Sequence, residues 1–196
     1  MKLSSLTRTR GRRAVLATVP TVAVLGILMG GVAQGAVPVS MTVSGQQFKI
    51  SADRLEGEDF SQYAGQAKDA DGKQYPLAIA NIGYAELHNL CQSVKVPGVP
   101  LGLLISAGTE KNRPVVAQEL QIGMSDLRGT ARFEQIRIGV DASKVSTKES
   151  GSKGDFAMDS DRIDIDNLKQ VSMSTSAAVF NLTDLHLQIS DGTQCF

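Results

Sequence analysis

The stretch FKISADRL, residues 48–55, alternates apolar and other side chains and then ends on a leucine. In an extended chain Phe48, Ile50 and Ala52 would point to one face, because successive side chains of a strand point to opposite faces. Leu55 would point to the other face unless one extra residue, as in a β-bulge, brings it back. The stretch therefore predicts a strand with one buried face and a bend just before Leu55.

The same pattern recurs along the chain. The further copies are ANIGYAEL (80–87), LQIGMSDL (120–127), DRIDIDNL (161–168) and AVFNLTDL (178–185). In these copies Glu86, Asp126, Asn167 and Asp184 precede the last leucine, and Asp or Asn suits a tight bend. The copies start at uneven intervals, whereas a solenoid has a fixed period. We expect an all-β fold, either a single curved antiparallel β-sheet or a β-sandwich, with a short β-helix as the alternative.

The first 35 residues differ from the rest of the chain. Five basic residues and no acidic one occupy residues 1–13, an uncharged run follows from Ala14 to Ala33, and small residues stand at Ala33 and Gly35. This order is typical of a secretory signal peptide. The alternative is an N-terminal membrane-anchor helix, because the run is nearly long enough to span a bilayer. We expect residues 1–35 to be one of these and residues 36–196 to form a single β domain, secreted or on the extracellular side of the cell envelope.

Charge restricts the partners of that domain. The chain has 20 basic and 20 acidic residues, so removing the five basic residues of the first segment leaves 15 against 20. An excess of acid argues against nucleic acid as a partner, since nucleic-acid binding needs a basic surface. The domain also lacks tryptophan, so we expect an aliphatic core.

The chain has two cysteines, Cys91 and Cys195. Export to an oxidising compartment favours a disulfide between them, which would tie the C-terminus to the middle of the domain. Closing a loop of about 100 residues would stabilise the fold by roughly 4–5 kcal/mol on the chain-entropy model. We expect the last strand, LHLQISDG (185–192), to lie beside the strand that carries Cys91. With only two histidines in addition, no structural zinc site is expected, nor any other cofactor.

Catalytic signatures are weak. Ser125 lies in GMSDL, which lacks the second glycine of the G-x-S-x-G motif of α/β-hydrolases. His88 and His186 alternate with leucines, so both are expected on the outer face of a strand. The acidic residues of 155–166 lack the glycine of a calcium-binding loop. We therefore assign no catalytic residue and no metal ligand, and expect a protein without enzymatic activity.

The apolar faces of the strands offer a binding surface instead. The candidate lining residues are Phe48, Ile50, Ile122, Met124, Phe133, Ile163, Ile165, Phe180 and Leu182. If these faces are open, they could hold an acyl chain or a sterol; if they are closed, they form a packed core. We expect a structural or binding role toward a hydrophobic small molecule or a cell-surface membrane protein. The alternative is a lipid-ester hydrolase, which requires a serine close to His88 or His186.

The residues FKISADRLEGEDFSQYAG (48–65), NLCQSV (89–94) and QCF (194–196) resemble a family of small secreted actinobacterial proteins with a signal peptide and one cysteine pair. The resemblance covers about residues 41–196. No activity is established for this uncharacterised family, and some members carry the label cholesterol esterase, which the residues here do not support. Family members are often encoded beside a multi-pass membrane protein, so the resemblance implies a partner at the cell surface.

Overall fold

Long strands dominate residues 41–196, the part of the chain that the computed structural model describes. The elements are β1 (Met41–Val43), β2 (Phe48–Asp69), β3 (Gln74–His88), β4 (Leu90–Lys95), β5 (Gly102–Ala107), β6 (Val115–Glu134), β7 (Arg137–Asp141), the 3-10 turn η1 (Ala142–Lys144), β8 (Phe156–Ser176), β9 (Val179–Asn181) and β10 (His186–Ser190). The predicted signal peptide or anchor at residues 1–35 lies outside the described residues. Within the described range, no helix is both long enough and apolar enough to cross a membrane.

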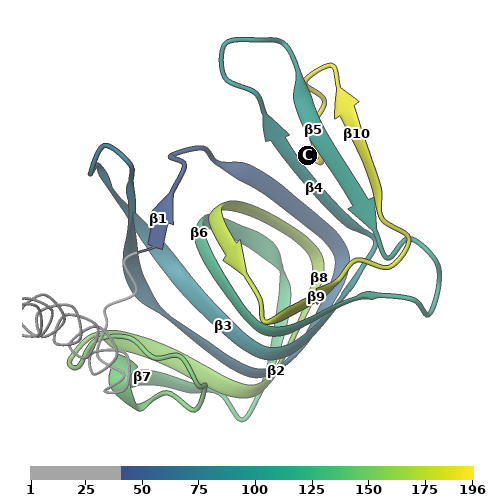
Figure 1. Ribbon diagram of the computed structural model, residues 1–196. Coiled ribbons are helices and arrows are strands. Elements are labelled where there is room, and N and C mark those ends of the chain that lie inside the picture. The colour runs from purple at the N-terminus through teal and green to yellow at the C-terminus, as the bar shows by residue number, and fades with distance from the viewer. Residues whose placement is uncertain (1–40) are drawn as a thin grey trace, which may run out of the picture. The chain divides into compact units, whose positions relative to one another are not determined.

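Four of these strands close into a small barrel. β2 pairs with β3, β3 with β6, β6 with β8, and β8 returns to β2 through residues 168–172 opposite residues 48–52. Figure 1 shows these strands curling around one another. The prediction of an all-β fold is confirmed. The sheet closes on itself, however, and its pairs are antiparallel except for β1 with β2, so the parallel coils of a β-helix do not describe it.

A three-stranded arm continues the sheet beyond the barrel. β4 pairs with the first residues of β2, β5 pairs with β4, and β10 pairs with β5 at the edge. In Figure 1 these three strands rise away from the barrel. The expectation that residues 185–192 lie beside the strand of Cys91 is wrong, because β5 lies between β10 and β4. The chain after β10 turns back toward β4 and thereby brings Cys195 to Cys91.

The hairpin that β2 forms with β3 and β4 bends without shifting its register. The register between β2 and the β3–β4 segment is the same from the pair Phe48–Val94 to the pair Lys68–Gln74. A strand normally cannot gain a residue without shifting its register with its neighbour. The register survives here because the bend at Asn89 in one strand lies opposite Asp53 in the other, where the Asn89 amide donates to the Asp53 carboxylate at 3.1 Å.

These bends line up across neighbouring strands, and we call each line of bends a crease. The first crease passes from Asn167 through Asp53 and Asn89 to Gly108 and Asp184, and all of these except Asp53 have positive φ. The second passes from Asp59 through Gly83 to Glu119. Asp59 and Glu119 have φ of 55° and 52°. A side chain at Gly83 would approach the Asp59 Cβ to 3.0 Å, so a glycine allows the crease to fold tightly there.

Most residues at the creases share a backbone conformation and a type of neighbour in the sequence. Asp59, Asn89, Glu119 and Asn167 all have positive φ, and each directly precedes a buried Phe or Leu. The sequence pattern found two of the bends, at Asn167 and Asp184. At Arg54, Glu86 and Asp126, where the pattern also predicts a bend, φ is not positive. Asp and Asn tolerate the left-handed conformation better than most residues, which explains why they predominate at the creases.

The bends keep apolar side chains directed into the barrel. Along β2 the buried inward residues are Ile50, Ala52 and Leu55, and then Phe60 beyond the second crease. The interval between inward residues is two from Ile50 to Ala52 and three from Ala52 to Leu55, as predicted. The barrel core also includes residues from β3, β6 and β8, such as Ile82. A second cluster under η1 contains Val43, Tyr63, Ala67, Leu77, Ile79, Ala142, Ala157 and Met173.

Candidate functional site

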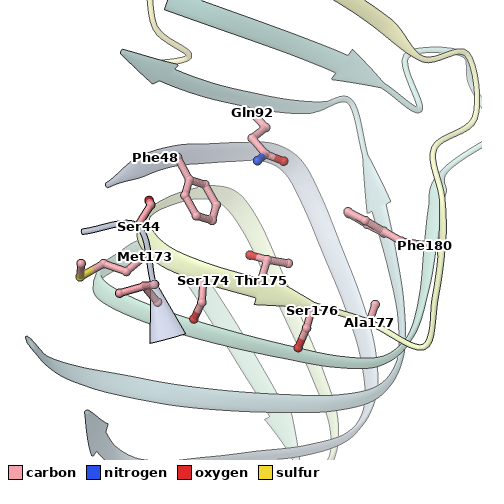
Figure 2. Close-up of a pocket in the computed structure, with 10 residues that line it drawn as sticks. Ser44, Phe48, Gln92, Met173, Ser174, Thr175, Ser176, Ala177 and Phe180 are labelled. Atoms are coloured by element: carbon pink, nitrogen blue, oxygen red, sulfur yellow. The ribbon is translucent and has the colours of Figure 1, made fainter. Parts of the chain in front are cut away.

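A groove of about 400 Å³ opens where the arm leaves the barrel. Phe48 and Gln92 project into it from one wall, and Thr175 and Ala177 face them from the other, as Figure 2 shows. Phe180 of β9 lies at one end of the groove. Its full lining is Val43, Ser44, Phe48, Gln92, Met173, Ser174, Thr175, Ser176, Ala177 and Phe180. The volume lies in the range of roughly 300–1,000 Å³ that small-molecule sites occupy.

Strand pairing extends this groove onto the arm. Phe48 lies opposite Val94, which lies opposite Leu103, which lies opposite Ile189. Directly paired residues project from the same face of a sheet. The four side chains therefore form one row that runs from the groove to the edge of the arm.

A second row runs parallel to the first and comprises Ile50, Gln92, Ile105 and Leu187. Ile50 belongs to the barrel core, so the two rows continue the same face of the sheet that lines the barrel. We call the arm part of these rows, Val94, Leu103, Ile105, Leu187 and Ile189, the open arm face. Leu187 and Ile189 remain 54% and 68% exposed.

The opposite face of the arm is covered by the C-terminal tail. Cys195 forms a disulfide with Cys91, as predicted, and its backbone N–H donates to the Ser93 hydroxyl at 3.1 Å. The Lys49 ammonium donates to the Phe196 carbonyl oxygen at 2.6 Å and lies 4.8 Å from the centre of the Phe196 ring. The tail thus closes one face of the arm, whereas none of the described residues covers the apolar face in the same way.

The residues that line the groove in the described part of the chain are polar in part but carry no charge. Ser44, Gln92 and residues 174–176 line it, and none of the residues that line it within the described chain is ionisable. The hydroxyls of Ser174 and Thr175 are buried and have no hydrogen-bond partner among the described residues. Leaving a buried hydroxyl unpaired costs about 1–3 kcal/mol. Behind Val43 and Met173, burial raises the pKa of Tyr63, so this phenol is neutral as well.

The structure separates the sequence-predicted lining residues into two groups. Phe48 and Phe180 lie in the groove. The remaining residues are elsewhere: Ile50, Ile122, Met124, Ile163 and Ile165 are buried in the barrel core, and Phe133 and Leu182 pack partly against it. Sequence analysis missed Gln92 and Thr175. The signal for Gln92 was its place between Leu90 and Val94, a polar residue on an otherwise apolar strand face.

The histidines and Ser125 lie on separate elements. His88 lies opposite Arg54 in β2, and His186 lies opposite Ser106 on the arm. The Ser125 hydroxyl accepts from the Gln47 amide at 3.3 Å and donates to the Val171 carbonyl at 3.4 Å. No contact in the described chain links these groups into a nucleophile and base.

Several carboxylates of the acidic stretch 155–166 pair with arginines. Asp159 accepts from Arg137, and Asp164 accepts from the Arg162 Nε at 3.2 Å. In residues 41–196, no group of three or more His, Cys, Asp or Glu side chains is arranged to hold a metal ion.

Comparison with known proteins identifies a family. The model of a family of unknown function, DUF6230, matches residues 44–196, which include the four barrel strands, the arm and every residue that lines the groove except Val43. No curated protein and no solved structure matches the chain.

Proposed function

This chain belongs to the DUF6230 family of unknown function, and from the geometry of the groove we propose that it is a non-catalytic protein, which binds a hydrophobic small molecule outside the cytoplasm. The chemical class of the ligand is one with an acyl chain or a comparable apolar body. It would lie in the groove and extend along the open arm face.

One observation carries the proposal: the face that lines the barrel core continues from the groove to the edge of the arm, where it becomes partly and then largely exposed. Inside the barrel this face is buried by the other strands, whereas on the arm Leu187 and Ile189 face solvent. Contiguous exposed apolar surface beside a pocket marks binding sites in soluble proteins. Covering it with an apolar ligand would gain about 25 cal/mol for each Å² removed from water.

The proposed location rests on two further observations. The first segment of the chain has the composition of an export signal. The tail is fastened by a disulfide, which persists in oxidising compartments and is rare in the cytosol. We therefore place the protein at the extracellular side of the cell envelope, where a lipid or a membrane protein could supply the apolar partner.

Lipid extraction tests the proposal. The protein is purified after export, extracted with organic solvent, and the extract analysed by mass spectrometry. We expect a stoichiometric hydrophobic compound from the wild type and little from Ala177→Phe, because the larger side chain would fill the groove. Ile138→Phe is the matched control, since Ile138 lies on β7 and does not line the groove.

Thermal unfolding of both variants establishes that each is folded before its extract is compared. A clean wild-type extract, together with no uptake of added lipid, would overturn the binding proposal. Turnover of a lipid ester by the wild type would instead support the hydrolase that sequence analysis named as the alternative.

A further inference from the structure

The polar groups of the groove indicate which hydrophobic molecules fit it. This inference rests on the proposed function and adds a prediction about the head group of the ligand. Gln92 offers an amide that forms no hydrogen bond with any described residue, and it projects into the groove beside Phe48 (Figure 2). Across the groove Thr175 has a buried hydroxyl without a partner among the described residues. An apolar chain alone would leave both groups unpaired.

The neighbourhood of Gln92 shows where the head group and the chain would lie. Gln92 is the polar member of the row Ile50, Gln92, Ile105 and Leu187. Ile105 and Leu187 lead from it along the open arm face toward the edge strand β10. A head group at Gln92 would therefore place its chain over the arm, with the polar end in the groove and the apolar end toward β10.

Charge decides the chemical class of that head group. The described lysines near this part of the sheet lie on its other face, because Lys49 and Lys95 alternate with Phe48 and Val94. Lys49 also donates a hydrogen bond to Phe196. A carboxylate or phosphate brought into the groove would lose water and find no cation, which is far more costly than burying a neutral group. A hydroxyl or an ester can bond to an amide and a hydroxyl without this cost.

We infer that the groove selects uncharged amphiphiles, such as long-chain alcohols and esters, over ionised fatty acids and phospholipids. Gln92 and Thr175 hold the head group, and the open arm face holds the chain. Selection comes from the absence of a cation among the described residues that line the groove, so introducing one at the head-group position should change the preference.

Three probes with ten-carbon chains test this inference: 1-decanol, methyl decanoate and sodium decanoate, titrated into the purified protein by calorimetry at about pH 8. At this pH the carboxylate is ionised, since a carboxyl group titrates near pH 4. We expect the alcohol and the ester to bind at least about ten-fold more tightly than decanoate, which corresponds to roughly 1.4 kcal/mol. Gln92→Leu and Thr175→Val should each weaken decanol binding by about five-fold, the loss of one hydrogen bond.

A gain-of-function variant makes the test specific. Gln92→Lys places an ammonium in the groove, so decanoate should bind more tightly than decanol. The matched control is Gln188→Lys, which adds the same charge to the same arm. Gln188 pairs with Leu104 and lies on the face opposite Gln92, so this variant should keep the wild-type preference.

The possible outcomes separate this inference from the proposed function. Preference for the alcohol and ester in the wild type, reversed only by Gln92→Lys, supports the inference. Equal or tighter binding of decanoate by the wild type overturns the inference but leaves a hydrophobic-ligand protein. Failure of the wild type to bind any of the three probes overturns this inference, and when the extract is also clean it overturns the proposed function too.

Discussion

At the scale of single residues, Asp159 is the most deeply buried charged residue in the described chain. Its side chain is 1% exposed, and it accepts from Arg137, whose side chain is 56% exposed, and from the backbone N–H of Ser146 at 2.8 Å. Burial alone would raise the pKa of Asp159, but the hydrogen bonds from Arg137 and Ser146 outweigh it and hold the pKa below the ordinary value. The carboxylate therefore depends on its partners to remain charged inside the fold.

Replacing Arg137 should be costly because it isolates this carboxylate. We expect Arg137→Met to lower the free energy of unfolding by about 2–4 kcal/mol, since removing one partner of a buried pair leaves the other charge uncompensated. Urea denaturation measures the change. The matched control is Arg128→Met, which breaks the exposed pair with Asp126 and should cost less than about 1 kcal/mol. Equal losses in the two variants would contradict this account of Asp159.

At the scale of the strand, the creases set the path of the chain. Glu119 adopts φ of 52° within β6, a conformation that costs a non-glycine residue about 1–2 kcal/mol. Its carboxylate lies 3.3 Å from the Lys148 ammonium, a surface pair of small value. The backbone strain at Glu119 therefore costs more free energy than the ion pair of its side chain contributes to stability.

Glycine at this position should relieve the strain. We expect Glu119→Gly to leave stability unchanged or raise it by up to about 1 kcal/mol, because glycine adopts positive φ at no steric cost. The neighbouring Gln118 is also exposed but does not have positive φ, so Gln118→Gly should destabilise by about 0.5–1 kcal/mol. The sign of the difference between the two melting temperatures checks the prediction, and a larger loss for Glu119→Gly would refute it.

Much of each strand could be predicted from the sequence, and much of the barrel closure could not. Alternation at Phe48, Ile50 and Ala52 identified β2 because burial of one face fixes the period locally. Closure depends on the pairing of residues 48–52 with 168–172, which no local pattern specifies. For the same reason the sequence could not separate Phe48, in the groove, from Ile50, which is two residues away on the same face but buried in the barrel.

At the scale of the whole described chain, acid should weaken the fold. Hydrogen bonds from Ser143 lower the pKa of Asp141, and hydrogen bonds from Thr193 lower the pKa of Asp191. The pKa of Asp69 is also lowered, because hydrogen bonds from Lys73 and Tyr75 outweigh its desolvation. The same direction at Asp159 means that all four carboxylates release their protons more readily in the folded state than in the unfolded chain.

The sign of the pH dependence follows from this difference. The unfolded chain binds more protons in the window between the lowered folded-state pKa values and about pH 4. The stabilisation is therefore fully present above that window and is lost as the pH falls through the folded-state pKa values. We expect the urea midpoint to decrease steadily from about pH 5 to pH 2.5, and to decrease less in Asp141→Asn. A midpoint that stays constant or rises over this range would contradict the prediction.

The alignment of bends across neighbouring strands also has an evolutionary consequence. Asp53 and Asn89 keep their strands in step because both chains reach the crease after the same number of residues. A single-codon insertion between two creases would displace one strand against its neighbours and turn inward side chains toward water. Homologous proteins should therefore vary in length at the hairpin tips, such as residues 70–73 and 96–101, while the segments between creases retain a fixed number of residues.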